Sequence, residues 1–167
     1  MRRIILPALI LLFAGQIALF AQEDPKEVFE KSWNTESDSE RVQLREMIEE
    51  TYPGTEYGLF CKGWLMIQKD EYRPSLEYLD KAISMNDKFW QAYHIRANVH
   101  GMLGDKGKAI EDLSSVISLN PSYADAYYVR GAIYYYEGDK VKGCSDISRA
   151  SELGSVKAED LKKKLCK

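Results

Sequence analysis

Apolar positions recur at helical spacing along most of this chain, and one such stretch is repeated. The segment SLEYLDKAISMND, which begins at Ser75, aligns with AIEDLSSVISLNP, which begins at Ala109, 34 positions later. Each stretch carries an apolar stripe that another helix must cover. A period of this length is typical of stacked helical pairs, in which neighbouring units share one continuous core.

The same spacing extends over three consecutive stretches of the chain. Gly104 and Gly138 occupy matching positions, and each suits the left-handed residue that ends a first helix. We therefore predict an all-α fold in which every unit holds two antiparallel helices joined by a tight turn. The predicted units are 56–89, 90–123 and 124–157.

Shorter helices are expected on both sides of these units. Asp24, which precedes a proline, is typical of a helix N-cap, and Ser37 with Glu40 fits a capping box. Residues 22–55 are therefore predicted to form a divergent N-terminal helical cap, or alternatively a degenerate fourth repeat. Residues 158–167 are predicted to form a short C-terminal helix that covers the last unit.

The N-terminus has the pattern of a secretory signal peptide. Two arginines precede an apolar run from Ile4 to Phe20, and cleavage is expected after the small residue Ala21. An uncleaved membrane anchor is the alternative, although the run is short for a membrane span. We predict that residues 1–21 are removed, that the mature protein is exported to the periplasm or the medium, and that it is not inserted in a membrane.

The charge balance bears on possible partners. Without residues 1–21 the protein keeps 21 basic and 26 acidic residues, a formal charge of −5. Nucleic-acid binding requires a basic face, which this composition does not predict. The longest cationic run, at Lys162–Lys164, is typical of a solvated last helical turn.

The repeats resemble the tetratricopeptide repeat. That pattern places aromatic, small and aromatic residues at fixed positions of the first helix and alanine in the second. In the third unit Tyr127, Gly131 and Tyr134 match the first helix, and Ala150 matches the second. The resemblance covers 56–157 and implies an α-solenoid of about three helix–turn–helix units.

Two positions bear on packing within the units. One is held by Gly63, Ala97 and Gly131, where the two helices of a unit should come closest. At another, a basic residue replaces the leucine of the family pattern in all three units, which leaves the local packing open. The third unit also lacks the closing proline. The basic residues are Lys62, Arg96 and Arg130.

The resemblance implies a binding protein. In this family the first helix of each unit lines a concave face, which here would be rich in aromatic and apolar side chains and would suit a peptide or partner helix. For Phe60 and Trp64, burial beneath the N-terminal cap is an equal alternative, whereas Tyr128, Tyr135 and Tyr136 are expected to be exposed. The candidate partner-binding residues are Tyr57, Phe60, Trp64, His94, Asn98, Met102, Tyr128, Tyr135 and Tyr136.

One known specialisation of the family does not fit. Some members hold a C-terminal carboxylate with lysine, asparagine and arginine side chains of the concave face. None of the matching residues here is a lysine, an asparagine or an arginine. Lys106 and Lys140 are expected to point outward and to contribute little to binding. The matching positions are Phe60, Trp64, Ile95, Asp125 and Val129.

No pattern predicts catalysis, a cofactor or a metal site. His94 and His100 are six residues apart, so they lie on different helix faces and lack the spacing of a helical metal pair. No glycine-rich phosphate loop precedes a helix, and no nucleophile is set beside a base. We therefore predict a protein that is not an enzyme and carries no cofactor and no metal.

Two of the three cysteines suit a disulfide. If the last helices turn near Gly154, Cys144 and Cys166 lie opposite each other across the hairpin. Two unpaired thiols in an apolar seam are the alternative. Cys61 would then be either a buried, inert thiol or the partner of a thiol on another protein.

The function predicted from these observations is a non-catalytic protein–protein interaction scaffold of the cell envelope, with another protein or a peptide as its partner. The alternative is a structural accessory subunit of an envelope assembly complex. Apolar surface outside the concave face would favour that alternative.

Overall fold

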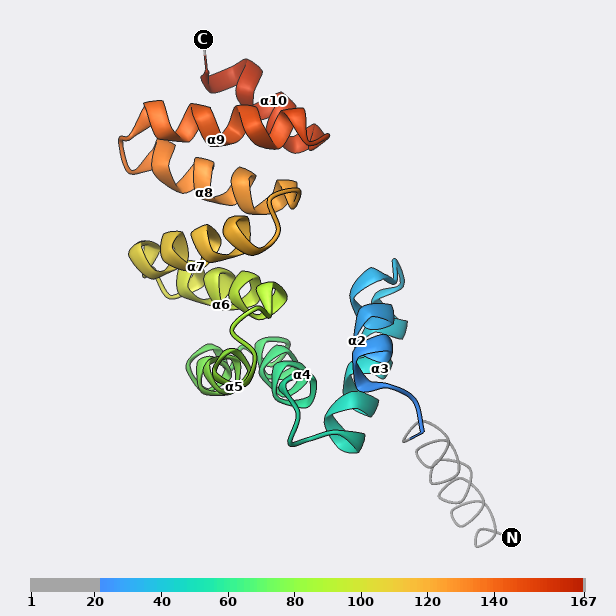
Figure 1. Cartoon of the computed structure of the whole chain (residues 1–167). Helices are drawn as coiled ribbons and strands as arrows, with labels where there is room; N and C mark the ends of the chain where they lie inside the picture. Colours follow the sequence, from blue (N-terminus) through green and yellow to red (C-terminus); the bar gives the residue numbers. More distant parts are fainter. Residues whose placement is uncertain (1–21, 167) are drawn as a thin grey trace, which may run out of the picture. The chain divides into compact units, whose positions relative to one another are not determined.

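The computed structural model describes residues 22–166, and every regular element in that range is an α-helix (Figure 1). The all-α prediction is confirmed. The predicted signal peptide, residues 1–21, lies outside the described residues. No helix of the described part is long and apolar enough to cross a bilayer. The protein forms two compact units with a boundary between Met85 and Asn86, and each unit is described by itself.

Between residue 22 and the unit boundary, the first unit contains four helices, and each packs against the next one along the sequence. Their bounds are α2 Pro25–Asn34, α3 Asp38–Thr51, α4 Glu56–Ile67 and α5 Tyr72–Met85.

Short polar side chains begin the first two helices. The Asp24 carboxylate accepts a hydrogen bond from the backbone N–H of Lys26 at 2.7 Å, and the Ser37 hydroxyl accepts one from that of Glu40 at 3.3 Å. Each cap satisfies a backbone donor that the helix itself leaves unpaired. The predicted N-caps are confirmed, but the Glu40 carboxylate accepts a hydrogen bond from the Thr35 hydroxyl instead of completing a capping box.

Side chains from all four helices close the core of the first unit. Phe29 of α2 and Phe60 of α4 are fully buried, with ring centroids 5.0 Å apart and an edge-to-face arrangement. Ile48 of α3 and Leu79 of α5 are also fully buried. The N-terminal helices α2 and α3 therefore cover one side of α4.

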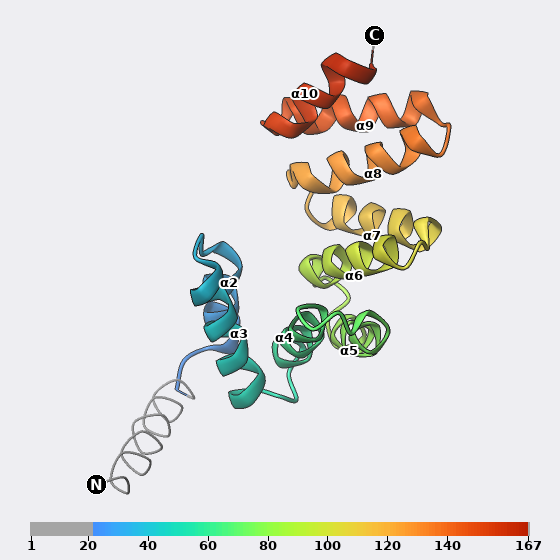
Figure 2. The same ribbon diagram turned by 180° about the vertical axis from the view of Figure 1, so that it is seen from behind.

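The second unit contains five helices, which follow one another closely in space (Figure 2). Two antiparallel pairs, α6 with α7 and α8 with α9, are followed by a short last helix. Their bounds are α6 Trp90–Met102, α7 Lys106–Leu119, α8 Ala124–Tyr136, α9 Lys140–Glu152 and α10 Val156–Leu165.

Left-handed residues end several helices. Gly104 after α6 has a φ of 82° and Gly138 after α8 has a φ of 99°, a conformation that side chains disfavour. Both were predicted for this role, and the prediction is confirmed. The corresponding residue after α4 is Asp70, with a φ of 60°, because aspartate tolerates this conformation better than most residues.

The helices of the last pair touch through glycines. A Cβ added at Gly131 would lie 2.9 Å from the carbonyl oxygen of Gly143 and from the backbone nitrogen of Ile147. One added at Gly143 would lie 2.8 Å from the backbone nitrogen of Tyr135. The close approach predicted at Gly131 is therefore present, and α9 supplies a second glycine to the same seam.

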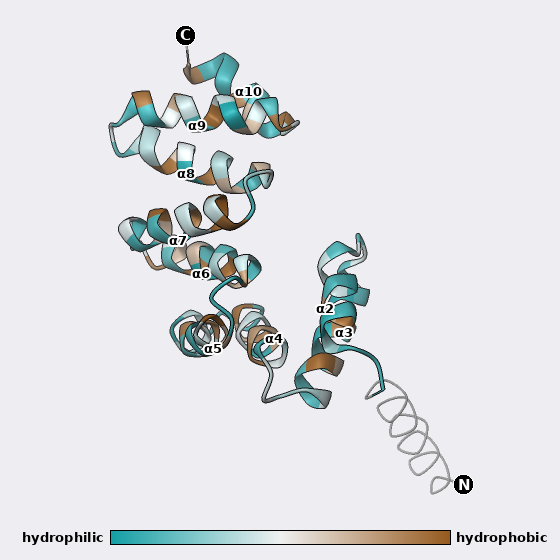
Figure 3. Cartoon of the chain, viewed as in Figure 1, coloured by the Kyte–Doolittle hydropathy of each residue, from teal (hydrophilic) through white to brown (hydrophobic). Residues whose placement is uncertain are grey.

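Two buried apolar clusters hold the second unit together. The first joins α6, α7 and α8, and the second joins α9 and α10. Figure 3 shows that the helices carry both hydrophobic and hydrophilic stretches, as expected when each buries only one face. The clusters contain Ala97, Leu113, Val116 and Ala126, and Ile147, Ala150 and Ala158, respectively.

Candidate functional site

The main candidate site is a cavity along α8. It has a volume of about 380 Å³ and is lined almost entirely by apolar surface from α8, with the start of α7 at its edge. Its lining includes Tyr128 and Tyr136, two of the candidate partner-binding residues, and the lining positions recur at helical spacing on one side of α8. The lining residues are Lys106, Tyr128, Val129, Ala132, Ile133, Tyr136 and Glu137.

The order of side chains along α8 explains why the cavity forms there. Val129 and Ile133 pack against the buried cluster of α6 and α7, which fixes the floor. Ala132 is small and leaves space between its larger neighbours. Tyr136, at the end of the helix, is 71% exposed and presents most of its ring to solvent. A tyrosine in this position can bury the apolar area of its ring against a partner while its hydroxyl group stays hydrated.

An ion pair borders the cavity. Lys106, the first residue of α7, pairs with Glu137, which follows α8. Both side chains are about half exposed, at 54% and 48%. Lys106 therefore lies at the edge of this cavity, and its small contribution to binding stays a prediction. Lys140 is exposed, and its amino group lies 5.6 Å from the centroid of the Tyr135 ring.

Tyr128 and Tyr135, the other two tyrosine candidates of α8, contact the region of α9 and α10. Tyr128 packs against the cluster of α9 and α10, and the Tyr135 hydroxyl donates a long hydrogen bond of 3.5 Å to the carbonyl oxygen of Leu165. Both side chains are half-buried, in contrast to Tyr136. The C-terminal helix thus takes part of the tyrosine surface that the sequence predicted to be open.

His94 and Asn98 of α6 belong to a polar cluster with two residues from the start of α8. His94 Nε2 lies 3.4 Å from Asn98 Nδ2, 3.4 Å from the Tyr123 hydroxyl and 3.7 Å from an Asp125 carboxylate oxygen. Burial lowers the pKa of His94, and the charge of Asp125 opposes the shift. His94 is 6% exposed, so its main role here is packing between the helices. Met102, by contrast, is 61% exposed at the end of α6.

The candidates of the first unit lie beneath or beside the N-terminal helices. Phe60 is fully buried, with Phe29 against its ring, and has no surface left for a partner. Of the two alternatives left open by the sequence, packing holds for this residue. Tyr57 is half-buried, with its ring centroid 5.2 Å from that of Phe29. Trp64 is half-buried and has a guanidinium group, that of Arg45, 4.2 Å from its ring centroid.

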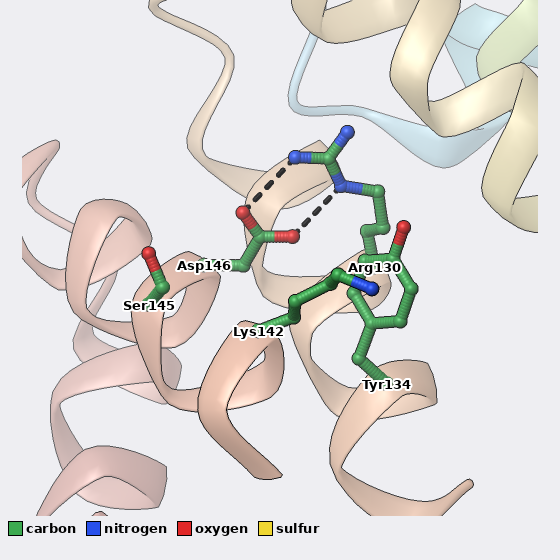
Figure 4. A pocket seen from close by; sticks show the side chains of 5 residues that line it. All are labelled: Arg130, Tyr134, Lys142, Ser145 and Asp146. Carbon is green, nitrogen blue, oxygen red and sulfur yellow. Dashed lines mark hydrogen bonds and ion pairs between the residues drawn. The ribbon is translucent and has the colours of Figure 1, made fainter. Parts of the chain in front are cut away.

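In the second and third repeats, the arginine that replaces leucine has a partner on the second helix of the repeat. Arg96 donates two hydrogen bonds to Asp112, at 2.8 and 2.6 Å. Arg130 donates two to Asp146, at 2.7 and 3.0 Å (Figure 4). Such paired bonds are strong because the planar guanidinium matches the carboxylate. The pKa of Arg130 is raised by its hydrogen bond to Asp146.

Sequence reasoning missed these pairs, although a signal was present. Asp112 and Asp146 are themselves 34 residues apart, and each follows its arginine by sixteen. In the first repeat, residues 56–89, the residue that matches Asp112 and Asp146 is Tyr78. Lys62 of this repeat pairs instead with Glu49, at 3.3 Å.

A smaller hollow of about 160 Å³ lies beside the Arg130–Asp146 pair (Figure 4). Tyr134, Lys142 and Ser145 complete its lining. Lys142 pairs with Asp139 at 2.8 Å, so each charged side chain around the hollow already has a partner within the protein. The Arg130–Asp146 pair therefore stabilises the contact between α8 and α9.

The predicted disulfide is present. Cys144 of α9 is bonded to Cys166, which follows α10, with Cα atoms 5.5 Å apart. Cys61 is a buried free thiol, and burial raises its pKa to about 12. Its thiolate form is therefore scarce at neutral pH, which makes it a packing residue. Over residues 22–166 no three histidine, cysteine or acidic side chains gather in a way that could hold a metal ion.

Comparison with known sequences identifies one repeat directly. Residues 91–123 match the family model described as tetratricopeptide repeat. A search of curated proteins found no match.

Comparison with solved structures extends the likeness over most of the sequence. The first tetratricopeptide domain of Spaghetti (RPAP3), bound to the HSP90 peptide SRMEEVD, has 22% identity and a TM-score of 0.62, covering 66% of this chain and 90% of that one. YrrB, described as a tetratricopeptide protein with an unusual peptide-binding site, has 20% identity and a TM-score of 0.62, covering 76% and 66%. MamA from Desulfovibrio magneticus RS-1 has 18% identity and a TM-score of 0.60, covering 80% and 77%.

At these identities the solved structures show a shared fold, and the matched repeat adds the sequence pattern. The chain thus contains a tetratricopeptide repeat at residues 91–123 and shares the fold of tetratricopeptide-repeat proteins.

Proposed function

We propose that the protein is a non-catalytic protein–protein interaction scaffold that binds a peptide or a partner helix on the α8 face. The observation that carries the proposal is the apolar cavity of about 380 Å³ beside the exposed Tyr136. Two proteins of the same fold are described as bound to a peptide or as having a peptide-binding site, which supports this use of the fold.

The dimensions of the cavity suit a single anchoring side chain of the partner. Its volume lies at the lower end of the range for small-ligand sites, and its apolar floor of Val129, Ala132 and Ile133 favours an aliphatic or aromatic group. The ion pair of Lys106 and Glu137 offers polar atoms at the border, where partner backbone groups remain partly solvated. Tyr128 and Tyr136 are the natural anchors because aromatic residues dominate binding energy in such patches.

We propose further that the protein acts in the cell envelope, exported to the periplasm or secreted. The signal-peptide pattern of residues 1–21 supports export, and the disulfide suits an oxidising compartment.

The second candidate, a structural subunit of an envelope complex, draws on a different observation. Val141 is 83% exposed and Val156 is 75% exposed, and neither lines the α8 cavity. Single exposed valines are common on soluble proteins, so this observation weighs less than a cavity.

The test is a capture experiment with matched baits. The mature protein is used to capture partners from the envelope fraction of the cells that make it, and the affinity of each purified partner is measured. Replacing Tyr128 and Tyr136 with alanine is expected to weaken binding by at least about 2 kcal/mol, roughly thirtyfold in Kd. Val141→Ala is the control and should leave Kd unchanged. Loss of binding with Val141→Ala alone would favour the structural subunit and contradict the scaffold.

A further inference from the structure

Arg45 of α3 is a buried arginine without an acidic partner. Its side chain is 2% exposed, and its Nε has no hydrogen-bond partner among the described residues. Three aromatic rings surround its guanidinium group, with centroid distances of 4.2 Å to Trp64, 5.3 Å to Phe60 and 5.7 Å to Trp33. A buried polar group of this kind requires an explanation, because nearly all such groups are paired.

The positive charge of Arg45 is not balanced by its described neighbours. Arg96 and Arg130, in the other unit, each donate two hydrogen bonds to an aspartate, whereas no described carboxylate pairs with Arg45. Burial lowers the pKa of Arg45 to about 10; the neighbouring Cys61 opposes this shift, and the nearby charge of Arg41 adds to it. Arg45 is still charged at neutral pH. The adjacent Cys61 thiol, with its pKa raised to about 12, supplies no compensating anion.

The aromatic rings account for only part of this burial. A guanidinium group gains cation–π energy when its faces lie on aromatic rings, but its N–H groups point outward in its plane and still require acceptors. Arg41 cannot share the task, because it already pairs with Asp38 and donates to the carbonyl oxygen of Thr35. A single guanidinium group whose N–H donors lack an acidic partner matches one carboxylate, which carries one negative charge. A phosphate dianion carries two, so its site would favour a second cation beside Arg45.

We propose that Arg45 binds a carboxylate group presented by the protein partner. The inference rests on the proposed scaffold function and specifies the chemistry of the partner. Trp33 and Trp64 are both half-buried, so the aromatic cluster around the guanidinium group reaches the surface of the first unit. The site differs from the carboxylate clamp of the family, since its cation comes from α3, before the first full repeat.

The carboxylate has two possible sources, the side group of a glutamate or aspartate and the C-terminus of the partner polypeptide. The probes are N-acetyl-glutamic acid α-amide for the side group and N-acetyl-alanine for the terminus, with N-acetyl-glutamine α-amide as the neutral control. The readout is tryptophan fluorescence of the whole mature protein, because Trp33 and Trp64 both lie against Arg45. A saturable change with at least one carboxylate and none with the neutral amide is expected. The probe with the lower Kd identifies the source.

Three variants locate the response. Arg45→Met removes the charge and should abolish the saturable change. Arg45→Lys keeps the charge but lacks the planar pair of N–H donors, and it should raise Kd several-fold. Arg41→Met removes the neighbouring charge and should retain the response. Circular dichroism checks that each variant is helical. If Arg45→Met does not fold, the comparison of carboxylates with the neutral amide on the wild-type protein still decides.

No saturable response of the wild type to either carboxylate would overturn the proposal, as would an unchanged response in a folded Arg45→Met variant. This outcome is distinct from failure of the scaffold function. If captured partners still depend on Tyr136 while carboxylates leave Trp33 and Trp64 unaffected, the scaffold stands and the Arg45 site does not.

Discussion

At the scale of single residues, Gly131 determines how closely α8 and α9 pack. The atoms that a side chain there would meet are backbone atoms of Gly143 and Ile147, which cannot rotate away. The position was identified from the sequence because the family pattern places a small residue there. The role of Gly143 was not predicted, because the residue of α9 that lies against Gly131 depends on how the two helices pack.

We expect Gly131→Leu to reduce the free energy of unfolding by about 1–3 kcal/mol, since the helices must separate to admit the side chain. Gly101→Ala is the matched control, because Gly101 lies in α6 with no atom near an added Cβ. That change should be neutral or stabilise by up to about 1 kcal/mol through helix propensity. Urea unfolding measures both. A Gly131→Leu variant as stable as the wild type would mean that the α8–α9 seam is wider than the structure has it.

His94 makes stability depend on pH. Its pKa is lowered by burial from an ordinary value of 6.5, with Asp125 acting against the shift. Because the unfolded protein binds the proton more readily, the stability contributed by neutral His94 is present above about pH 6.5 and is lost as pH falls toward the folded-state pKa. In urea unfolding between pH 7.5 and pH 5, the loss of stability should be smaller for His94→Gln than for the wild type. Equal losses would show that burial of His94 has no energetic consequence.

At the scale of elements, the helix boundaries were largely predictable. Asp24, Ser37, Gly104 and Gly138 act through local chemistry, so their effect can be inferred from neighbouring residues alone. The Arg–Asp pairs were not inferred, because the family pattern specifies leucine at the arginine position. Contacts of this kind depend on which residue lies opposite on another helix, and a pattern for one helix does not contain that information.

The disulfide should stabilise the last hairpin. Cys144 and Cys166 are separated by 22 residues, and closing a loop of this size constrains the unfolded protein by about 3 kcal/mol. We expect the Cys144→Ser, Cys166→Ser double variant to lose stability of this order and to show faster hydrogen exchange in α10. Adding a reductant to the double variant should have no further effect, which is the control. Mass spectrometry of the unreduced wild type should find the two peptides linked. Free thiols at both positions would contradict the assignment.

At the scale of the whole molecule, the fold was more predictable than the binding residues. The 34-residue spacing specifies helical pairs wherever it occurs, independent of the partner. Exposure of a first-helix residue depends on what lies over it. Phe60 is covered by α2, and Tyr135 contacts the end of α10. The repeat pattern could not predict this cover, because these flanking helices differ from the repeats in sequence. Tyr136 and Met102 lie at helix ends and remain open.

The central claim is that a partner binds on the α8 face, and site-specific photo-crosslinking tests it most directly. A photoreactive phenylalanine analogue is placed at Tyr136 in one variant and at Val141 in another, because both positions are strongly exposed and only Tyr136 lines the cavity. Each variant is expressed in the cells that make the protein and irradiated. We predict a specific crosslinked partner from position 136 and none from position 141. A partner crosslinked from position 141 but not from position 136 would contradict the account.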